Sequence, residues 1–159
     1  MVVRAATSAD LPRVGVLAGM LVRQHHALDP QRFFLVDGVE KGYERFLAGE
    51  LRRRDAIVLV AEEEGEGGGI LGYAYATLEP RNWNDLLDAC GKLSDVLVDP
   101  ATRRRGVGRA LVQAVRAELG RRGAPRMVLM SAWRNPEAHA FFEALGFRRT
   151  MLEMTLELG

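Results

Sequence analysis

Residues 93–111 read LSDVLVDPATRRRGVGRAL, and this stretch decides how the rest of the chain is interpreted. An apolar run at 96–98 is followed by a loop with three consecutive arginines at 103–105, and a helical pattern begins at Gly106 and Gly108. A helix start presents unpaired N–H groups and the positive end of the helix dipole, and glycine lets an anion approach the backbone closely. The stretch therefore predicts a binding site for a pyrophosphate or a similar polyanion.

Length and composition are those of an ordinary globular protein. The chain has 159 residues, of which 48% are hydrophobic and 27% charged, and we expect one domain over residues 1–159. No apolar run approaches the roughly 20 residues of a membrane span, and no secretion signal is evident, so we expect a cytoplasmic protein with no membrane partner. The formal net charge of +1 argues against nucleic acid as a partner, so the arginines of the loop act locally.

Hydrophobic periodicity on both sides of the opening stretch predicts an α/β protein of the α+β type, with a mixed sheet covered by helices on both faces. A glycine-rich turn at 64–69 joins two strands of a hairpin, and a short helical turn is expected near 86–87. The strand at 126–131 has little polar content and is expected at a central position, while 152–158 alternates as a half-buried strand does. The expected strands are 2–6, 57–63, 70–78, 93–98, 126–131 and 152–158, and the expected helices are 11–22, 39–54, 107–119 and 135–146.

Two common kinds of anion loop do not fit these residues. The phosphate loop of nucleotide hydrolases needs a lysine after its last glycine, and none follows Gly106 or Gly108. A dinucleotide fingerprint needs a third glycine where Leu111 stands, so that match is weak.

A third comparison fits better. Arg103-x-x-Gly106-x-Gly108, between an apolar strand and an amphipathic helix, resembles the acyl-CoA site of the GNAT superfamily of N-acetyltransferases. A second stretch, 135–147, with its Asn-Pro-Glu-Ala start, aromatic pair and terminal Gly-Phe, is similar to another motif of that family. The resemblance covers residues 93–147 and implies a central mixed, mostly antiparallel sheet of six to seven strands flanked by about four helices.

The resemblance also implies acetyl-CoA as co-substrate. The single cysteine cannot form a thiolate metal cluster, and we expect no metal site. Backbone N–H groups from 104 to 109 would hold the pyrophosphate, and the strand at 96–98 would pair with the pantetheine arm. An N–H at Leu97 or Val98 would polarise the thioester carbonyl. The implied acetyl-CoA-binding residues are Val96, Leu97, Val98, Arg103, Arg104, Arg105, Gly106, Val107, Gly108, Arg109, Asn135, Ala138 and Phe142.

The implied chemistry is direct attack of a neutral amine on the thioester, which requires a base and an acid. Asp95 is the leading candidate base, because it interrupts an apolar strand and is expected to share a face with Leu93 and Leu97. A partly exposed carboxylate at a strand edge explains Asp95 equally well. Glu79, acting through water, is the alternative base.

The expected acid is missing. Phe142 stands where the family usually has a tyrosine that protonates the departing thiolate. A water molecule, the hydroxyl of Ser131 or Tyr75, or no acid at all must then serve.

The leading hypothesis is an N-acetyltransferase that moves an acetyl group from acetyl-CoA to a primary amine of a small molecule, protein or peptide. The alternative is a CoA-binding sensor or accessory protein without turnover, for which Phe142 is the motivating departure. Local nucleic-acid binding by the arginines is a third hypothesis. Many members of the family are dimers, so a homodimer is also expected.

Overall fold

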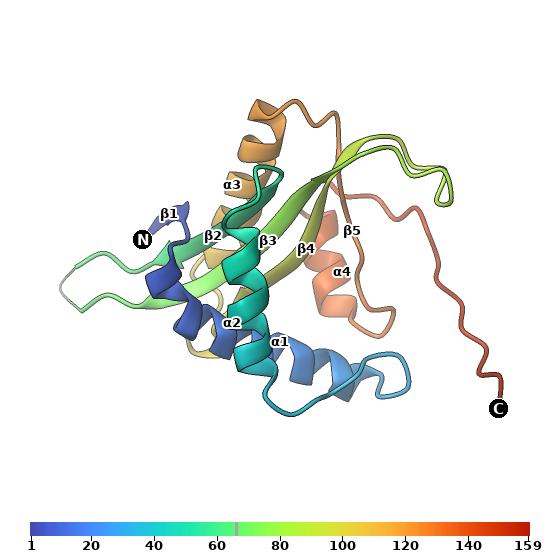
Figure 1. Cartoon of the computed structure of the whole chain (residues 1–159), viewed down its shortest axis with the longest axis horizontal. Coiled ribbons are helices and arrows are strands. Elements are labelled where there is room, and N and C mark those ends of the chain that lie inside the picture. The colour runs from blue at the N-terminus through green and yellow to red at the C-terminus, as the bar shows by residue number, and fades with distance from the viewer. Residues whose placement is uncertain (66) are drawn as a thin grey trace.

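The computed structural model describes residues 1–65 and 67–159, and Glu66, which falls in the predicted glycine-rich turn, lies outside the described residues. The described part of the chain forms one five-stranded sheet and four α-helices (Figure 1). The strands are β1 (Val2–Ala5), β2 (Ala56–Glu62), β3 (Ile70–Glu79), β4 (Cys90–Val98) and β5 (Met127–Leu129). The helices are α1 (Leu11–Leu28), α2 (Val39–Glu50), α3 (Val107–Arg121) and α4 (Pro136–Glu143), with short 3-10 turns η1 (Ser8–Asp10) and η2 (Pro100–Thr102).

The sheet confirms the predicted mixed, mostly antiparallel arrangement. Its strands lie in chain order, with antiparallel pairing from β1 to β4 and parallel pairing between β4 and β5. The parallel pair is joined through α3, as a crossover between parallel strands requires.

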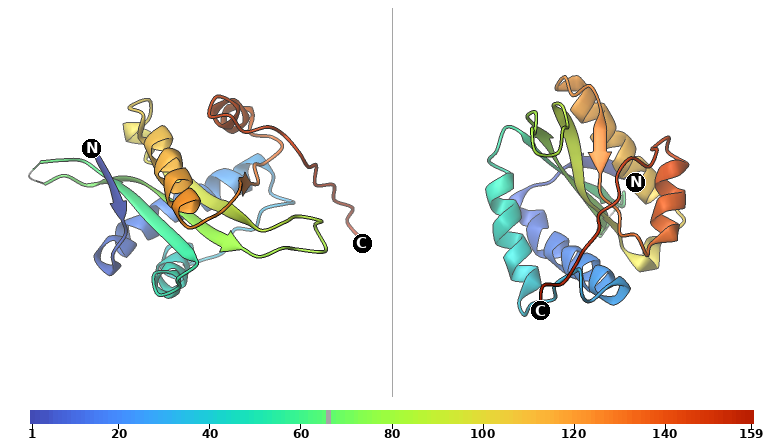
Figure 2. Two further views of the ribbon diagram at one scale, coloured as in Figure 1. Left: turned by 90° about the horizontal axis from the view of Figure 1, so that it is seen from above. Right: turned by 90° about the vertical axis from the view of Figure 1, so that its right-hand side faces the viewer.

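The helices cover both faces of the sheet, as predicted (Figure 2). On one face, α1 and α2 pack on Tyr73, Tyr75 and Leu97, and the buried apolar side chains of this layer include Val14, Leu17, Leu47, Val58 and Val60. On the other face, α3 packs on Ala74, Ala76 and Leu93 through Val107, Leu111, Val115 and Leu119, and the aromatic residues of α4 pack at its side. Among the described residues, none of the helices has the length and apolar character needed to cross a membrane.

The predicted number of strands, six to seven, is wrong, because the described residues form five. Residues 152–158 alternate as a strand does but have no sheet partner within the described chain, and Leu158 at their end is 93% exposed. Periodicity identifies an extended segment and its two faces, but the partner that would pair with it is a tertiary property.

Two further expectations are corrected. The strand predicted at 126–131 is the short β5, and it lies at the edge of the sheet rather than at the centre. The expected turn of helix at 86–87 is the tip of a long β3–β4 hairpin, closed by a bridge between Asn82 and Leu87, and Leu86 has a positive φ of 51°. A residue with that φ cannot continue a right-handed helix.

The start of the chain is held by a buried carboxylate. Asp10 is 9% exposed and accepts hydrogen bonds from both terminal nitrogens of Arg4, at 2.8 and 2.9 Å. It also accepts the backbone N–H of Thr7 at 2.7 Å, which is half of a capping box. The hydrogen bond from Arg4 is the largest cause that lowers the pKa of Asp10 to about 2.

We predict that Asp10→Asn lowers the free energy of unfolding by about 2 kcal/mol at pH 7. A depressed pKa means that the carboxylate stabilises the folded state above about pH 4 and that this stabilisation is lost as the pH falls toward 2. Urea unfolding from pH 7 to pH 2 should therefore show the two proteins converging. Asp37→Asn, at an exposed side chain, is the control and should change stability by less than about 0.5 kcal/mol. A pH-independent gap would contradict the ionic assignment.

Candidate functional site

A β-bulge at Ser94 shapes the centre of the site. Tyr75 pairs with Asp95 and Ala76 pairs with Leu93, so Ser94 is an extra residue in β4. The extra residue reverses the alternation of the strand. Leu93 therefore packs on the α3 side, while Leu97 packs on the α1 side together with Tyr73. The expectation that Asp95 shares a face with both leucines is wrong for Leu93, because simple alternation does not foresee a bulge.

The same strand opens a gap in the sheet. The parallel pairing of β4 with β5 ends at Leu93 and Leu129, so among the described residues the last part of β4 is paired only with β3. The N–H of Asp99 donates to the carbonyl of Leu71 at 2.8 Å, which sets the phase of the antiparallel ladder. By the alternation of such a ladder, the N–H of Leu97 faces β3, whereas the N–H groups of residues 96 and 98 face the gap.

The predicted glycine loop leads directly into α3. Gly106 is the residue before the helix and has a positive φ of 79°, and Arg104 also has a positive φ, of 63°. A Cβ at Gly108 would lie 3.3 Å from Phe141 and 3.5 Å from a Val98 methyl, so a larger residue there would push α4 away. The first N–H groups of α3 have no acceptor within the helix and are free for an anion.

A cavity of about 770 Å³ joins the glycine loop to the gap beside β4. Twelve of the thirteen predicted acetyl-CoA-binding residues line it, and the exception, Arg105, forms an ion pair with Glu63 at 2.5 Å. The other end of the cavity is lined by α1, by α2 and by the segment between them. The residues at that end include His25, Arg32, Phe33, Phe34 and Tyr43.

Asp95 lies in this cavity and is held by a tyrosine. The hydroxyl of Tyr73 donates to Asp95 Oδ2 at 3.1 Å. Burial raises the pKa of Asp95 to about 6, while the hydrogen bond from Tyr73 and the nearby His25 act in the opposite direction. The pKa of Tyr43 is raised to about 12, mainly by burial and also by the charge of Asp95. Asp95 is thus a carboxyl group whose pKa lies close to neutral pH.

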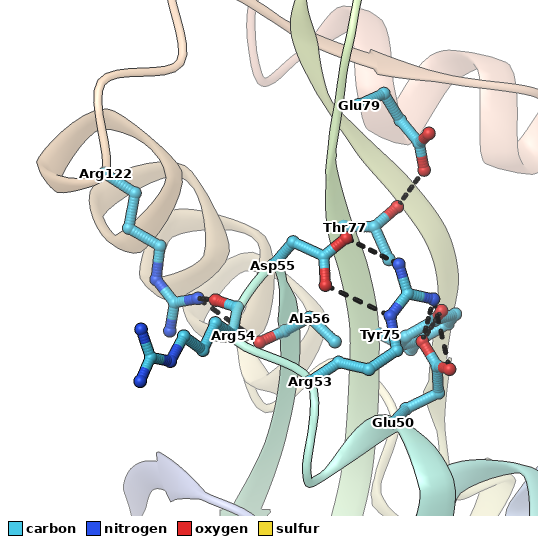
Figure 3. Close-up of polar contacts among 9 residues, drawn as sticks. All are labelled: Glu50, Arg53, Arg54, Asp55, Ala56, Tyr75, Thr77, Glu79 and Arg122. Carbon is cyan, nitrogen blue, oxygen red and sulfur yellow. Dashed lines mark hydrogen bonds and ion pairs between the residues drawn. The ribbon is translucent and has the colours of Figure 1, made fainter.

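The other polar candidates are occupied elsewhere (Figure 3). The hydroxyl of Tyr75 donates to Glu50, which is only 7% exposed and also accepts from Arg53 at 3.0 Å. Glu79, the alternative base, accepts a hydrogen bond from the hydroxyl of Thr77. Neither Tyr75 nor Glu79 is among the described residues that line the cavity, whereas Ser131 is.

Helix α4 forms one wall of the cavity. The side chain of Asn135 caps the helix by accepting the N–H of Ala138 at 3.1 Å. Phe142 lines the cavity and packs edge-on against Phe141 and Phe147, with ring centres 5.1 and 5.6 Å away. The position of the expected tyrosine therefore presents an aromatic ring that has no hydroxyl proton to donate.

Sequence reasoning missed the partners of Asp95. Tyr73 and Tyr43 show only as aromatic members of apolar patterns, and His25 as a residue near the end of a helix. A hydrogen bond that spans 22 residues across a bulged strand pair leaves no local signal.

The sequence of this chain matches a known protein family and several characterised relatives. Residues 17–147 match the family described as the acetyltransferase (GNAT) family. A glucosamine 6-phosphate N-acetyltransferase of Trypanosoma brucei brucei is 33% identical over 110 residues, which are 69% of this chain and 71% of that protein.

Several solved structures have the same fold as this chain. A mutant of the BH1408 protein from Bacillus halodurans superposes with a TM-score of 0.86 at 25% identity, covering 99% of both chains. An aminoglycoside N-acetyltransferase in complex with CoA has the same fold, with a TM-score of 0.73 at 19% identity over 98% of this chain and 93% of that one. The chain belongs to the GNAT family of acetyltransferases.

We predict that Asp95→Asn raises the free energy of unfolding by about 2 kcal/mol at pH 7.5. The pKa of Asp95 is raised on folding, so the folded state loses stability as the pH rises from about 4 to about 6, and an amide avoids this loss. Urea unfolding should show equal stability near pH 4 and a gap at pH 7.5. Tyr73→Phe, which removes a donor to the carboxylate, should act in the opposite direction at pH 7.5. A less stable Asp95→Asn at pH 7.5 would contradict the burial of this charge.

Proposed function

We propose that residues 1–159 form a single domain that transfers an acetyl group from acetyl-CoA to a primary amine by direct attack within a ternary complex. The observation that carries this proposal is one continuous cavity that is lined both by the start of α3 and by Asp95. Membership of the family and the CoA complex of one structural neighbour support it.

The glycine loop fits the pyrophosphate of CoA. The arginines at 103, 104 and 109 line the cavity around the start of α3 and supply positive charge. Positive φ at Gly106 turns the backbone so that the first helical N–H groups can converge on one anion. Arg105 is left out of this set, because it is paired with Glu63.

The open edge of β4 fits an amide-containing chain such as pantetheine. Its free N–H groups, at 96 and 98, can pair with the amides of an extended ligand as a neighbouring strand would. Acetyl-CoA supplies an acyl group activated as a thioester. Of the two donors expected for the thioester carbonyl, Val98 is favoured, because the N–H of Leu97 faces β3.

Asp95 is the proposed base. An ammonium substrate must lose a proton before its nitrogen can attack, and a base with a pKa near the working pH is best suited to accept that proton. Asp95 meets this requirement, with a pKa of about 6 in a cavity where acceptor and acyl group can meet. Glu79 is disfavoured because it does not line the cavity.

For the departing thiolate, the cavity offers the Ser131 hydroxyl or solvent. Tyr75 is disfavoured because its hydroxyl is committed to Glu50. Phe142 has no acidic proton to donate, which motivates the alternative of a CoA-binding protein without turnover. A sensor, however, has no need for a carboxylate with a raised pKa beside the proposed thioester site.

We predict turnover of acetyl-CoA with at least one member of a panel that contains glucosamine 6-phosphate, other amino sugars and a lysine peptide. The rate should fall as the pH drops through about 6, where Asp95 becomes protonated. Asp95→Asn should slow the reaction about 100-fold at pH 7, and by less at a pH where the amine is already neutral. Release of free thiol measures the rate.

Glu79→Gln is the matched control and should leave the pH profile unchanged. An equal loss in Glu79→Gln would transfer the role of base to Glu79. Binding of acetyl-CoA without turnover across the panel would favour the sensor alternative.

We predict that Gly106→Ala weakens acetyl-CoA binding about tenfold or more while lowering the free energy of unfolding by about 1 kcal/mol. A Cβ at this positive φ strains the loop and stands where the anion approaches. Gly123→Ala is the control, because Gly123 has a φ of 87° and equally open surroundings at the far end of α3. Isothermal titration should show a loss of affinity in Gly106→Ala only. Equal affinity in both variants would contradict the loop assignment.

A further inference from the structure

The segment between α1 and α2, residues 29–38, contributes Arg32 and Phe33 to the end of the cavity opposite the glycine loop. The backbone N–H groups of Arg32 and Phe33 both donate to the carbonyl of Asp29, at 3.2 and 3.0 Å. Nδ1 of His26 lies 2.8 Å from the carbonyl of Phe33, and it must be the donor because a carbonyl can only accept. The start of this segment is therefore held in a defined turn.

The side chain of Arg32 is positioned by stacking. Its guanidinium lies over the ring of Phe33, 5.0 Å from the ring centre. The Phe33 ring packs edge-on against His25, with ring centres 5.0 Å apart, and Nδ1 of His25 is 2.9 Å from the carbonyl of Leu21. Stacking fixes the plane of a guanidinium but leaves its N–H groups available to an oxyanion. Arg32 is therefore an oriented donor at the edge of the cavity.

Arg32 already binds a carboxylate of its own chain. Its Nε and Nη2 donate to the two carboxylate oxygens of Glu153, the second at 3.0 Å, and arginine recognises carboxylate and phosphate groups by this bidentate geometry. The hydrogen bond to Glu153 is the largest cause that raises the pKa of Arg32, and the charge of Asp29 adds to it. Within the described chain, no backbone hydrogen bond involves residues 148–159. The Glu153 carboxylate is thus a replaceable occupant of an oxyanion site.

The cavity joins this oxyanion site to the proposed base. Arg32 and Asp95 both line it, and an arginine stays positively charged at every working pH. The rings of Phe34 and Tyr43 line the same end and offer aromatic surface to the body of a ligand. One molecule can therefore place an amine at Asp95 and an anionic group at Arg32.

We propose that Arg32 binds an anionic group of the acceptor, so that the acceptor is a small molecule with both a primary amine and a carboxylate or phosphate. The anionic group replaces Glu153 on the guanidinium, and the amine lies at Asp95. Arg32 is then a specificity-determining residue, separate from the arginines of the glycine loop. This inference rests on the proposed acetyl transfer and narrows its class of substrate.

The test uses acceptors that differ only in the anionic group. Glucosamine 6-phosphate is compared with glucosamine, and γ-aminobutyrate with γ-aminobutyramide, so that phosphate and carboxylate are tested separately. Release of free thiol gives kcat and KM for each acceptor. In at least one pair, Arg32→Gln should raise KM for the anionic member about 30-fold and change KM for the neutral member less than about threefold. Arg148→Gln, at an exposed arginine that does not line the cavity, is the matched control and should change neither KM.

Glu153→Gln is the reciprocal variant. It removes the internal competitor from Arg32, so KM for the preferred anionic acceptor should fall about threefold while KM for its neutral partner stays the same. Arg32, Arg148 and Glu153 are all exposed, so circular dichroism should show unchanged folding in the three variants.

The possible failures are distinguishable. Turnover in which Arg32→Gln leaves every KM unchanged, or raises KM equally for anionic and neutral acceptors, would overturn the inference and leave the proposed reaction in place. A rise in KM for the anionic acceptor in Glu153→Gln would also overturn it, because the carboxylate would then assist binding instead of competing. Absence of turnover with every amine would overturn the proposed reaction and this inference together.

Discussion

The extra residue in β4 is the constraint on which the site depends. Before Ser94, the side chains and N–H groups of β4 alternate in one phase, and after it they alternate in the other. The change turns Asp95 toward Tyr73 and the layer of α1 and α2, and it turns the N–H of Val98 toward the gap. A regular strand would place the carboxylate against α3 instead, in a layer built of aliphatic side chains.

The cavity contains two regions that differ in their effect on a negative charge. The start of α3 and its arginines stabilise negative charge, while the region around Asp95 makes a negative charge costly enough to raise the pKa of the carboxyl to about 6. The start of α3 therefore favours an anionic group, whereas the surroundings of Asp95 favour the uncharged form of its carboxyl.

The short β5 follows from the same opening. Since β4 and β5 must diverge to leave the gap, only three residues of each strand are paired. Within the part of the chain that the structure describes, no strand is paired with the other side of β5, which lies at the edge of the sheet.

The local pattern of the chain determined the four helices and most of the strands, the glycine loop before α3 and the family resemblance, because each depends on neighbouring residues. It also placed Asp95 on the strand beside the loop. Only the tertiary structure decided the bulge at Ser94, the hydrogen bond from Tyr73, the commitment of Tyr75 to Glu50 and the edge position of β5. These features arise from pairing between distant segments, where the hydrophobic period gives the face of a strand but neither its partner nor its register.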